Sequence, residues 1–291
     1  MGDSRRMYFV GLDLPWGEKN HTGVAVIDPG GRLLHVGSAQ DDAGIDAAIA
    51  PYVSDECLVA IDAPLIVPNS EGRRIAEIEL GKDFMRFDAG PHFANKANAL
   101  FDPPRGAVLC GRLDLDMDPE SRAERRAIEV FPHAATVVLF RLPKILKYKK
   151  GEVEDRRREL LSLMTLIEGL DKATPRLRVN HNVAWVELRN RIAAATRQAQ
   201  LDRDEDPVDA VVCAYVALYR FHRPDDVTTY GDFASGYIIT PTLPSDLAPA
   251  PGRRPAQQPD SGDVLPRLEQ VQALIEKAQR ELTAIRRQLG G

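Results

Sequence analysis

The N-terminal part of the chain alternates short apolar runs with polar turns. Residues 8–13, 23–28 and 32–38 have the composition of strands, and the turn "DPGG" at 28–31 joins the last two as a tight hairpin. A helical stretch at 44–53 then leads into the apolar run Cys57–Leu65. This pattern predicts three antiparallel strands, a helix and a further buried strand.

The rest of the pattern predicts mostly helices. Residues 68–125 are rich in Arg, Asp, Pro and Gly and read as an insertion, with helical patches near 71–82 and 119–127. The run 127–134 reads as another strand, broken at Pro132. Helical periodicity follows at 153–169, at 183–199 and at 206–221, where Pro207 suits a first helical turn. We therefore predict an α/β fold with a mixed five-stranded sheet flanked by helices.

The C-terminal part has a different composition. Residues 242–263 are rich in proline and read as a linker between a domain at 1–241 and an amphipathic helix at 264–291. Apolar side chains recur there every seven residues at two positions, Leu268, Ile275, Leu282, Leu289 and Val264, Val271, Ala278, Ile285. The helix either folds back on the domain or self-associates through 264–289. The long linker and the narrow apolar stripe favour a homo-oligomer.

Composition is that of a globular protein. Apolar residues make up 44% and charged residues 28% of the 291 residues, and no run reaches the length of a membrane helix. The start has no signal-length apolar core, so we expect a cytoplasmic protein without a membrane partner. The three cysteines lack the spacing of a zinc site or a disulfide framework. With a net charge of −5, any bound nucleic acid must meet a local basic surface.

Carboxylates stand where apolar runs end. Asp13 ends the first predicted strand, Asp62 ends a later one, and Glu129 lies on the strand after the insertion. Asp206 and Asp209 are three residues apart on a predicted helix and so share one face. Asp206 could instead be the N-cap of that helix. Asp209 begins an apolar run, and we expect its side chain to point towards the sheet.

Several carboxylates at one sheet edge repel one another unless a cation lies among them. Oxygen ligands without His or Cys are typical of Mg²⁺ or Mn²⁺ sites. Two such ions roughly 4 Å apart can clamp the attacking water and the leaving oxygen of a phosphodiester. The pattern therefore predicts a metal site that includes Asp13, Asp62, Glu129, Asp206 and Asp209.

The chain also resembles a known family. The order of predicted strands and acids looks like the ribonuclease H-like fold, and "DPVDAVVCAY" is similar to a helix of its Holliday-junction resolvases. More closely, the chain resembles the family of domain of unknown function 429, usually described as ribonuclease H-like nucleases. The matching motifs are "GLDLPWG" (11–17), "AIDAPL" (60–65), "GRR" (72–74), "EVFPHA" (129–134), "KYKKG" (147–151), "DAVVCAYVA" (209–217) and "GYIITP" (236–241). The resemblance implies that Asp13, Asp62 and Asp209 are catalytic metal ligands, with Glu129 a fourth.

Basic residues near these motifs are candidates for binding a phosphate backbone. Lys147, Lys149 and Lys150 lie in a predicted loop that could overhang the acidic edge of the sheet. Arg73 and Arg74 are weaker candidates, since a solvated basic surface explains them equally well. His133, close to Glu129 in sequence, is either a general base or a structural side chain.

These observations favour a nuclease that hydrolyses phosphodiester bonds with two Mg²⁺ or Mn²⁺ ions. The alternative is a catalytically silent binding or scaffold protein of the same fold that acts through its C-terminal helix. Nucleotide hydrolysis of the actin-like type ranks last, because the chain has no second copy of the fold.

Overall fold

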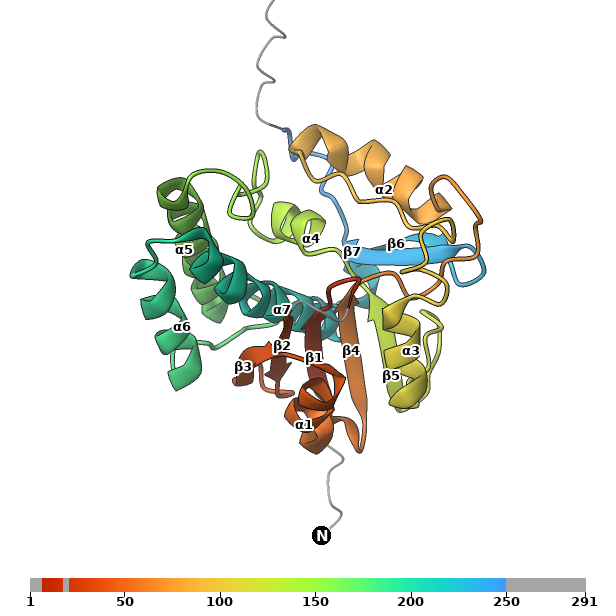
Figure 1. Cartoon of the computed structure of the whole chain (residues 1–291), viewed down its shortest axis with the longest axis horizontal. Helices are drawn as coiled ribbons and strands as arrows, with labels where there is room; N and C mark the ends of the chain where they lie inside the picture. The colour runs from red at the N-terminus through yellow and green to blue at the C-terminus, as the bar shows by residue number, and fades with distance from the viewer. Residues whose placement is uncertain (1–6, 18–20, 250–291) are drawn as a thin grey trace, which may run out of the picture. The chain divides into compact units, whose positions relative to one another are not determined.

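The computed structural model describes residues 7–17 and 21–249, and within them a mixed sheet of five strands in the order β3-β2-β1-β4-β5 (Figure 1). β1 pairs antiparallel with β2 and parallel with β4, β2 pairs antiparallel with β3, and β4 pairs parallel with β5. This confirms the predicted mixed five-stranded sheet. The strands are β1 (Tyr8–Asp13), β2 (Thr22–Ile27), β3 (Leu33–Ala39), β4 (Cys57–Asp62) and β5 (Arg125–Glu129).

Helices cover both faces of the sheet (Figure 1). On one face α1 (Asp42–Val53) and α3 (Arg105–Arg112) pack on the side chains of Val10 and Leu12. On the other face α7 (Gln198–His222) crosses β1 and β2, next to Phe9 and Ala25. Side chains of β1 therefore alternate between two apolar layers, as the period of a strand requires.

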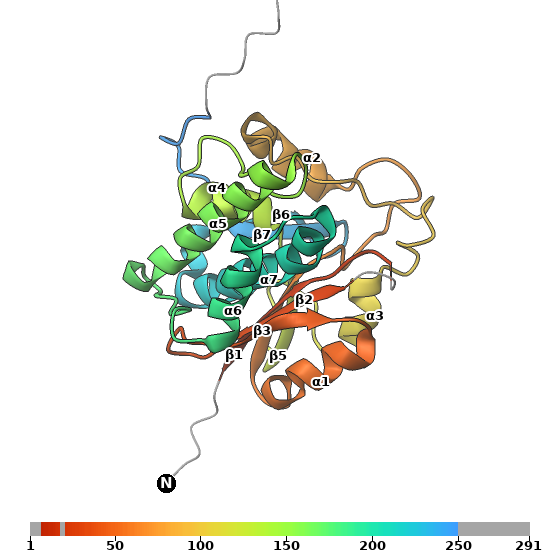
Figure 2. The same cartoon turned by 60° about the vertical axis from the view of Figure 1, so that its left-hand side comes forward.

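The layer around α7 contains three further helices. α4 (Pro132–Leu139), α5 (Val153–Gly169) and α6 (Val183–Ala193) contact α7, and Figure 2 shows α5 and α6 lying beside it. The described residues also form short 3₁₀ helices: η1 (Met85–Phe87) after α2 (Ile75–Phe84), η2 (Leu170–Lys172) after α5 and η3 (Pro224–Asp226) after α7.

Two glycines let α7 approach the sheet closely. A Cβ atom added at Gly11 would lie 2.0 Å from the carbonyl oxygen of Ala210, and one at Gly23 would lie 2.0 Å from that of Asp206. Backbone can replace side chain at these contacts only because glycine has no Cβ. The close approach brings the N-terminal half of α7 next to the end of β1.

A third apolar core lies beyond β5. It joins α2 (Ile75–Phe84) to α4 and to the hairpin of β6 (Val227–Asp232) and β7 (Gly236–Pro241), which the sequence analysis did not predict. Residues 242–249, assigned above to a linker, belong to the same compact unit as the sheet, because Leu247 is buried in this third core. The rest of the linker and the predicted helix 264–291 lie outside the described residues.

Other boundaries differ from the prediction. No helix forms at 119–127; turns there lead into β5. Pro132 does not break a strand but begins α4, since proline is well tolerated in a first helical turn. The predicted helix 183–199 ends earlier, at Ala193, and α7 begins at Gln198, eight residues before Asp206. None of the described helices is long and apolar enough to cross a membrane.

Candidate metal and active site

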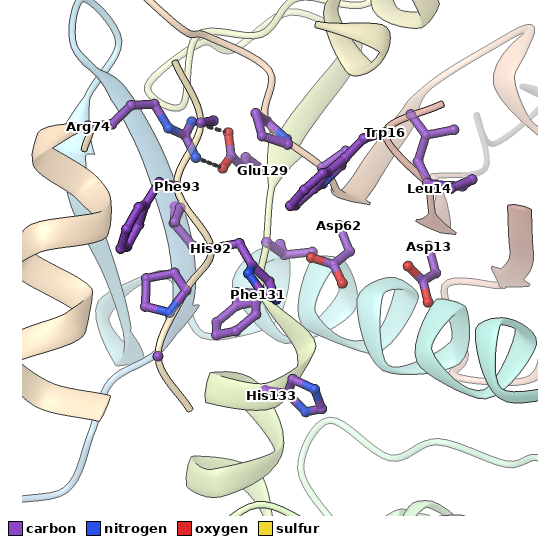
Figure 3. A pocket seen from close by; sticks show the side chains of 18 of the residues that line it. Asp13, Leu14, Trp16, Asp62, Arg74, His92, Phe93, Glu129, Phe131 and His133 are labelled. Atoms are coloured by element: carbon purple, nitrogen blue, oxygen red, sulfur yellow. Dashed lines mark hydrogen bonds and ion pairs between the residues drawn. The ribbon is translucent and has the colours of Figure 1, made fainter. Parts of the chain in front are cut away.

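A cavity of about 280 Å³ lies where β1, β4 and β5 end (Figure 3). The loops that follow these three strands line it, together with residues 90–94 of the insertion and Lys149. The carboxyl ends of parallel strands are the usual place for a binding site in such sheets. The strand ends therefore place the predicted acids at the edge of a hollow.

Asp13 and Asp62 are neighbours across β1 and β4. They are register partners in the parallel pair, so both side chains leave the sheet on the same face, the one covered by α7. Figure 3 shows the two carboxylates next to each other at the cavity wall. Asp13 is nine-tenths buried, and its Oδ2 atom accepts no hydrogen bond from residues 7–17 and 21–249.

Asp209 faces this pair from α7 and is fully buried. The hydroxyl group of Tyr148 donates a 2.6 Å hydrogen bond to its Oδ1 atom. The ammonium nitrogen of Lys149 lies 2.7 Å from Asp209 Oδ2 and 3.6 Å from Asp13 Oδ2. The structure thus brings together Asp13, Asp62 and Asp209, as predicted, and adds a lysine between two of them.

Negative charge is in excess at this point. Burial raises the pKa of Asp13 to about 6, with Asp209 adding to the effect and Lys149 opposing it. Burial, followed by the charge of Asp13, raises the pKa of Asp62 well above its usual value. Lys149 keeps its proton: burial lowers its pKa, but the charges of Asp13 and Asp209 raise it well above the usual value. We call Asp13, Asp62, Asp206, Asp209 and Lys149 the Asp13 cluster.

Asp206 lies inside α7 and is not an N-cap. Instead, the side chain of Gln200 accepts hydrogen bonds from the backbone of Thr196 and Arg197 at the start of this helix. Burial and the charge of Asp13 raise the pKa of Asp206 to about 9. Asp206 belongs to the cluster electrostatically but does not line the cavity.

Glu129 lines the same cavity as Asp13 and Asp62 but belongs to a different set of contacts. Its partner on β4 is Ile61, one residue before Asp62, so its side chain leaves the sheet on the opposite face. There Arg74 holds it with two hydrogen bonds of 2.6 and 2.9 Å, and the backbone N–H of Leu65 donates a third. The metal-ligand role of Glu129 stays a prediction, and its carboxylate is already paired with Arg74.

Arg74, a predicted contact for nucleic acid, lines the same cavity. It is buried, and its guanidinium also pairs with Glu77 at 2.8 Å. Glu77 in turn accepts a hydrogen bond from the backbone of Ala94, in the wall of the cavity. All four carboxylate oxygens of Glu77 and Glu129 accept hydrogen bonds. We call Arg74, Glu77 and Glu129 the Arg74 cluster.

The other predicted basic residues lie apart from the acids. Lys147 and Lys150 are exposed, and Lys147 pairs with Asp88 at 3.2 Å. Arg73 is also exposed and stacks on the ring of Phe93, 3.9 Å from its centroid. Lys149, by contrast, lines the cavity and contacts Asp13 and Asp209.

Several aromatic and imidazole groups of the site were missed or left open by the sequence analysis. Trp16 and Phe93 line the cavity with exposed rings, and Trp16 packs edge-on against His92. Burial lowers the pKa of His133 to about 4, so its ring is neutral, and its Nδ1 atom has no hydrogen-bond partner in the described part of the chain. Trp16 and His133 lie in the motifs "GLDLPWG" and "EVFPHA". Their place in these motifs is the feature of the sequence from which they could have been predicted as site residues.

The donor set fits a hard divalent cation in chemistry, because Asp13 and Asp62 offer carboxylate oxygens to the cavity and Asp13 Oδ2 is buried without a hydrogen bond. Within residues 7–17 and 21–249, however, no three side chains of the ligand types His, Cys, Asp and Glu are grouped to hold an ion. The third carboxylate, Asp209, would have to bind an ion held by Asp13, but Lys149 lies between these two acids.

A family model described as "Protein of unknown function (DUF429)" matches residues 11–234. The chain belongs to the DUF429 family. The matched part of this DUF429 protein contains both clusters, including Lys149. Comparisons with curated proteins and with solved structures gave no match.

Proposed function

We propose that this DUF429 protein is a metal-dependent phosphodiester hydrolase of the ribonuclease H-like type. The convergence of Asp13, Asp62 and Asp209 carries the proposal, because these acids come from two adjacent strand ends and a distant helix. The element order also supports it: three antiparallel strands, a parallel strand with a second acid, and a late helix with a third.

Asp13 and Asp62 would hold a Mg²⁺ or Mn²⁺ ion at the cavity wall. Raised pKa values mean that these carboxyl groups gain from a cation, which restores their charged form. When bound, the ion supplies Lewis-acid polarisation of water and of a phosphoryl oxygen. A second ion, as in the two-metal mechanism, could bind only if Asp209 gave up its ion pair with Lys149 and bound the metal in its place.

The chain's own groups would position the substrate. Lys149 holds a positive charge at the cavity wall, where a phosphate could replace solvent. The neutral ring of His133 offers its unpaired Nδ1 atom to a water or a sugar hydroxyl. Trp16 and Phe93 present exposed rings on which bases can stack. These features favour a nucleic acid with an unpaired base near the scissile phosphate.

Nuclease assays test the proposal directly. Labelled single-stranded RNA, single-stranded DNA, hybrid, duplex and branched substrates are incubated with the protein in Mn²⁺. We expect cleavage of at least one substrate, reduced at least about 100-fold in Asp13→Asn and Asp62→Asn, since each tenfold loss corresponds to about 1.4 kcal/mol of transition-state stabilisation. Asp114→Asn is the matched control, because Asp114 has a side chain 97% exposed. No cleavage, or equal cleavage by Asp13→Asn, contradicts the proposal.

A catalytically silent binding protein is the second candidate. The observation in its favour is Lys149, which already places a positive charge between Asp13 and Asp209. Calorimetry with Mn²⁺ separates the two functions. A hydrolase should bind Mn²⁺ and lose this binding in Asp13→Asn, whereas a silent scaffold need show no such binding.

A further inference from the structure

Lys149 occupies a position that a bridging cation would take. Its ammonium nitrogen lies 2.7 Å from Asp209 Oδ2 and 3.6 Å from Asp13 Oδ2. Apart from this lysine, no group of the described residues donates a hydrogen bond to either oxygen. The shorter contact has the length of a charge-assisted pair, as expected for an ammonium acting as a compact point charge.

The backbone around Lys149 is held in place from two directions. The ring of Tyr148 is buried, and its hydroxyl group donates to Asp209. The carbonyl oxygen of Tyr148 accepts a 2.7 Å hydrogen bond from buried Arg156, which also pairs with Glu205 on α7. The neighbouring lysines, Lys147 and Lys150, are exposed. Lys149 is therefore directed to the acids by the fold.

Access to the cavity separates the acids into two sets. Asp13 and Asp62 line the cavity, whereas Asp209 is fully buried behind Lys149 and does not. An ion that enters through the cavity meets Asp13 and Asp62 and then the ammonium group. Like charges within a few ångströms repel strongly where solvent is excluded. A second divalent ion between Asp13 and Asp209 would have to displace Lys149.

We propose that Lys149 is the second cation of the site, so that the protein binds one divalent ion, at Asp13 and Asp62, instead of two. This inference rests on the proposed function. It makes Lys149 a fixed, metal-independent charge that neutralises Asp209 and faces the substrate cavity. Asp13, which is nine-tenths buried and lies 3.6 Å from this ammonium group, would be one of the two residues that hold the ion.

The number of bound Mn²⁺ ions tests the inference. Isothermal titration calorimetry gives the stoichiometry, and electron paramagnetic resonance detects coupling between two ions roughly 4 Å apart. We expect one ion in the wild type, two coupled ions in Lys149→Met, and one ion in Lys150→Met, the matched control with an exposed lysine. Lys149→Arg retains the charge and should bind one ion.

Each other outcome has a distinct meaning. Two ions in the wild type, or a single ion in a folded Lys149→Met, overturn the inference but leave the metal-dependent function standing. No ion in any variant overturns the proposed function as well. Circular dichroism checks folding, and should Lys149→Met not fold, the stoichiometry of the wild type and of Lys149→Arg decides alone.

Discussion

Two groups of buried and half-buried carboxylates lie next to the same cavity, and they differ in how they are hydrogen-bonded. In the Arg74 cluster every carboxylate oxygen accepts a hydrogen bond, from one guanidinium and from backbone N–H groups. In the Asp13 cluster, Asp13 Oδ2 and Asp209 Oδ2 have no partner other than Lys149 among the described residues, and this single lysine faces four carboxyl groups.

This difference in hydrogen bonding distinguishes acids that stabilise the fold from acids that could bind a cation. A buried carboxylate whose oxygens all accept hydrogen bonds is compatible with a stable fold. Each missing hydrogen bond costs on the order of 1–3 kcal/mol, and a buried charge without compensation costs several kcal/mol. The Arg74 cluster joins β5, α2 and the cavity wall and reads as structural. The Asp13 cluster keeps an electrostatic cost that a bound cation would relieve.

Removing Arg74 should give the largest effect on stability. Arg74→Met leaves Glu77 and Glu129 buried without their partner, which costs about 3–5 kcal/mol in comparable pairs. Urea denaturation measures the loss. Arg73→Met, at an exposed position, should change the free energy of unfolding by less than about 0.5 kcal/mol. Equal effects of the two substitutions would show that the Arg74 cluster is not structural.

A second prediction concerns pH and the acid-rich end of α7. Burial raises the pKa of Glu205 from 4.5 to about 7. Between these values the folded protein keeps a proton that the unfolded chain has released, so stability falls as pH rises through this window, by at most about 3 kcal/mol. Denaturation of the metal-free protein in chelator at pH 4.5–7.5 measures the slope. Glu205→Gln should flatten it, and an unchanged slope would contradict the assignment.

The same chemical change in the two clusters should have unequal effects. Glu129→Gln turns an acceptor of Arg74 and Leu65 partly into a donor and should cost about 2 kcal/mol. Asp13→Asn removes excess charge and should leave the metal-free protein equally stable or slightly more stable. Thermal denaturation without metal compares the two. A larger loss in Asp13→Asn would reverse the distinction between the clusters.

A loss no larger than that of Glu129→Gln should come from Lys149 and its exposed neighbour in the same assay. Lys149→Met removes a charge that Asp209 needs, and Lys150→Met removes one that faces solvent. We expect a loss of about 1–2 kcal/mol for the first, discounted for the third of its side chain that is exposed, and less than about 0.5 kcal/mol for the second. Similar values for both would mean that the ion pair is weak.

Much of this arrangement could be predicted from local sequence. Apolar runs that end in Asp13 and Asp62 mark adjacent strand tips, and strand tips of a parallel pair meet at one edge. Asp209 begins an apolar run, and its complete burial on α7 confirms that its side chain does not face solvent. These three placements need only strand and helix periodicity.

The remaining features depend on tertiary register and could not be predicted this way. Whether Glu129 faces the same side as Asp62 depends on a one-residue offset between β4 and β5. The start of α7 at Gln198 depends on caps that are not apparent from helix periodicity. Lys149 differs from Lys147 and Lys150 only because the loop that carries it folds over α7.

The most direct test of the account is a crystal of this protein soaked in Mn²⁺ and measured at the manganese absorption edge. We predict an anomalous peak at Asp13 and Asp62, on the cavity side of Lys149, and no peak at Glu129 and Arg74. A peak at Glu129, or none at Asp13 and Asp62, would contradict the claim that Asp13 and Asp62 hold the cation.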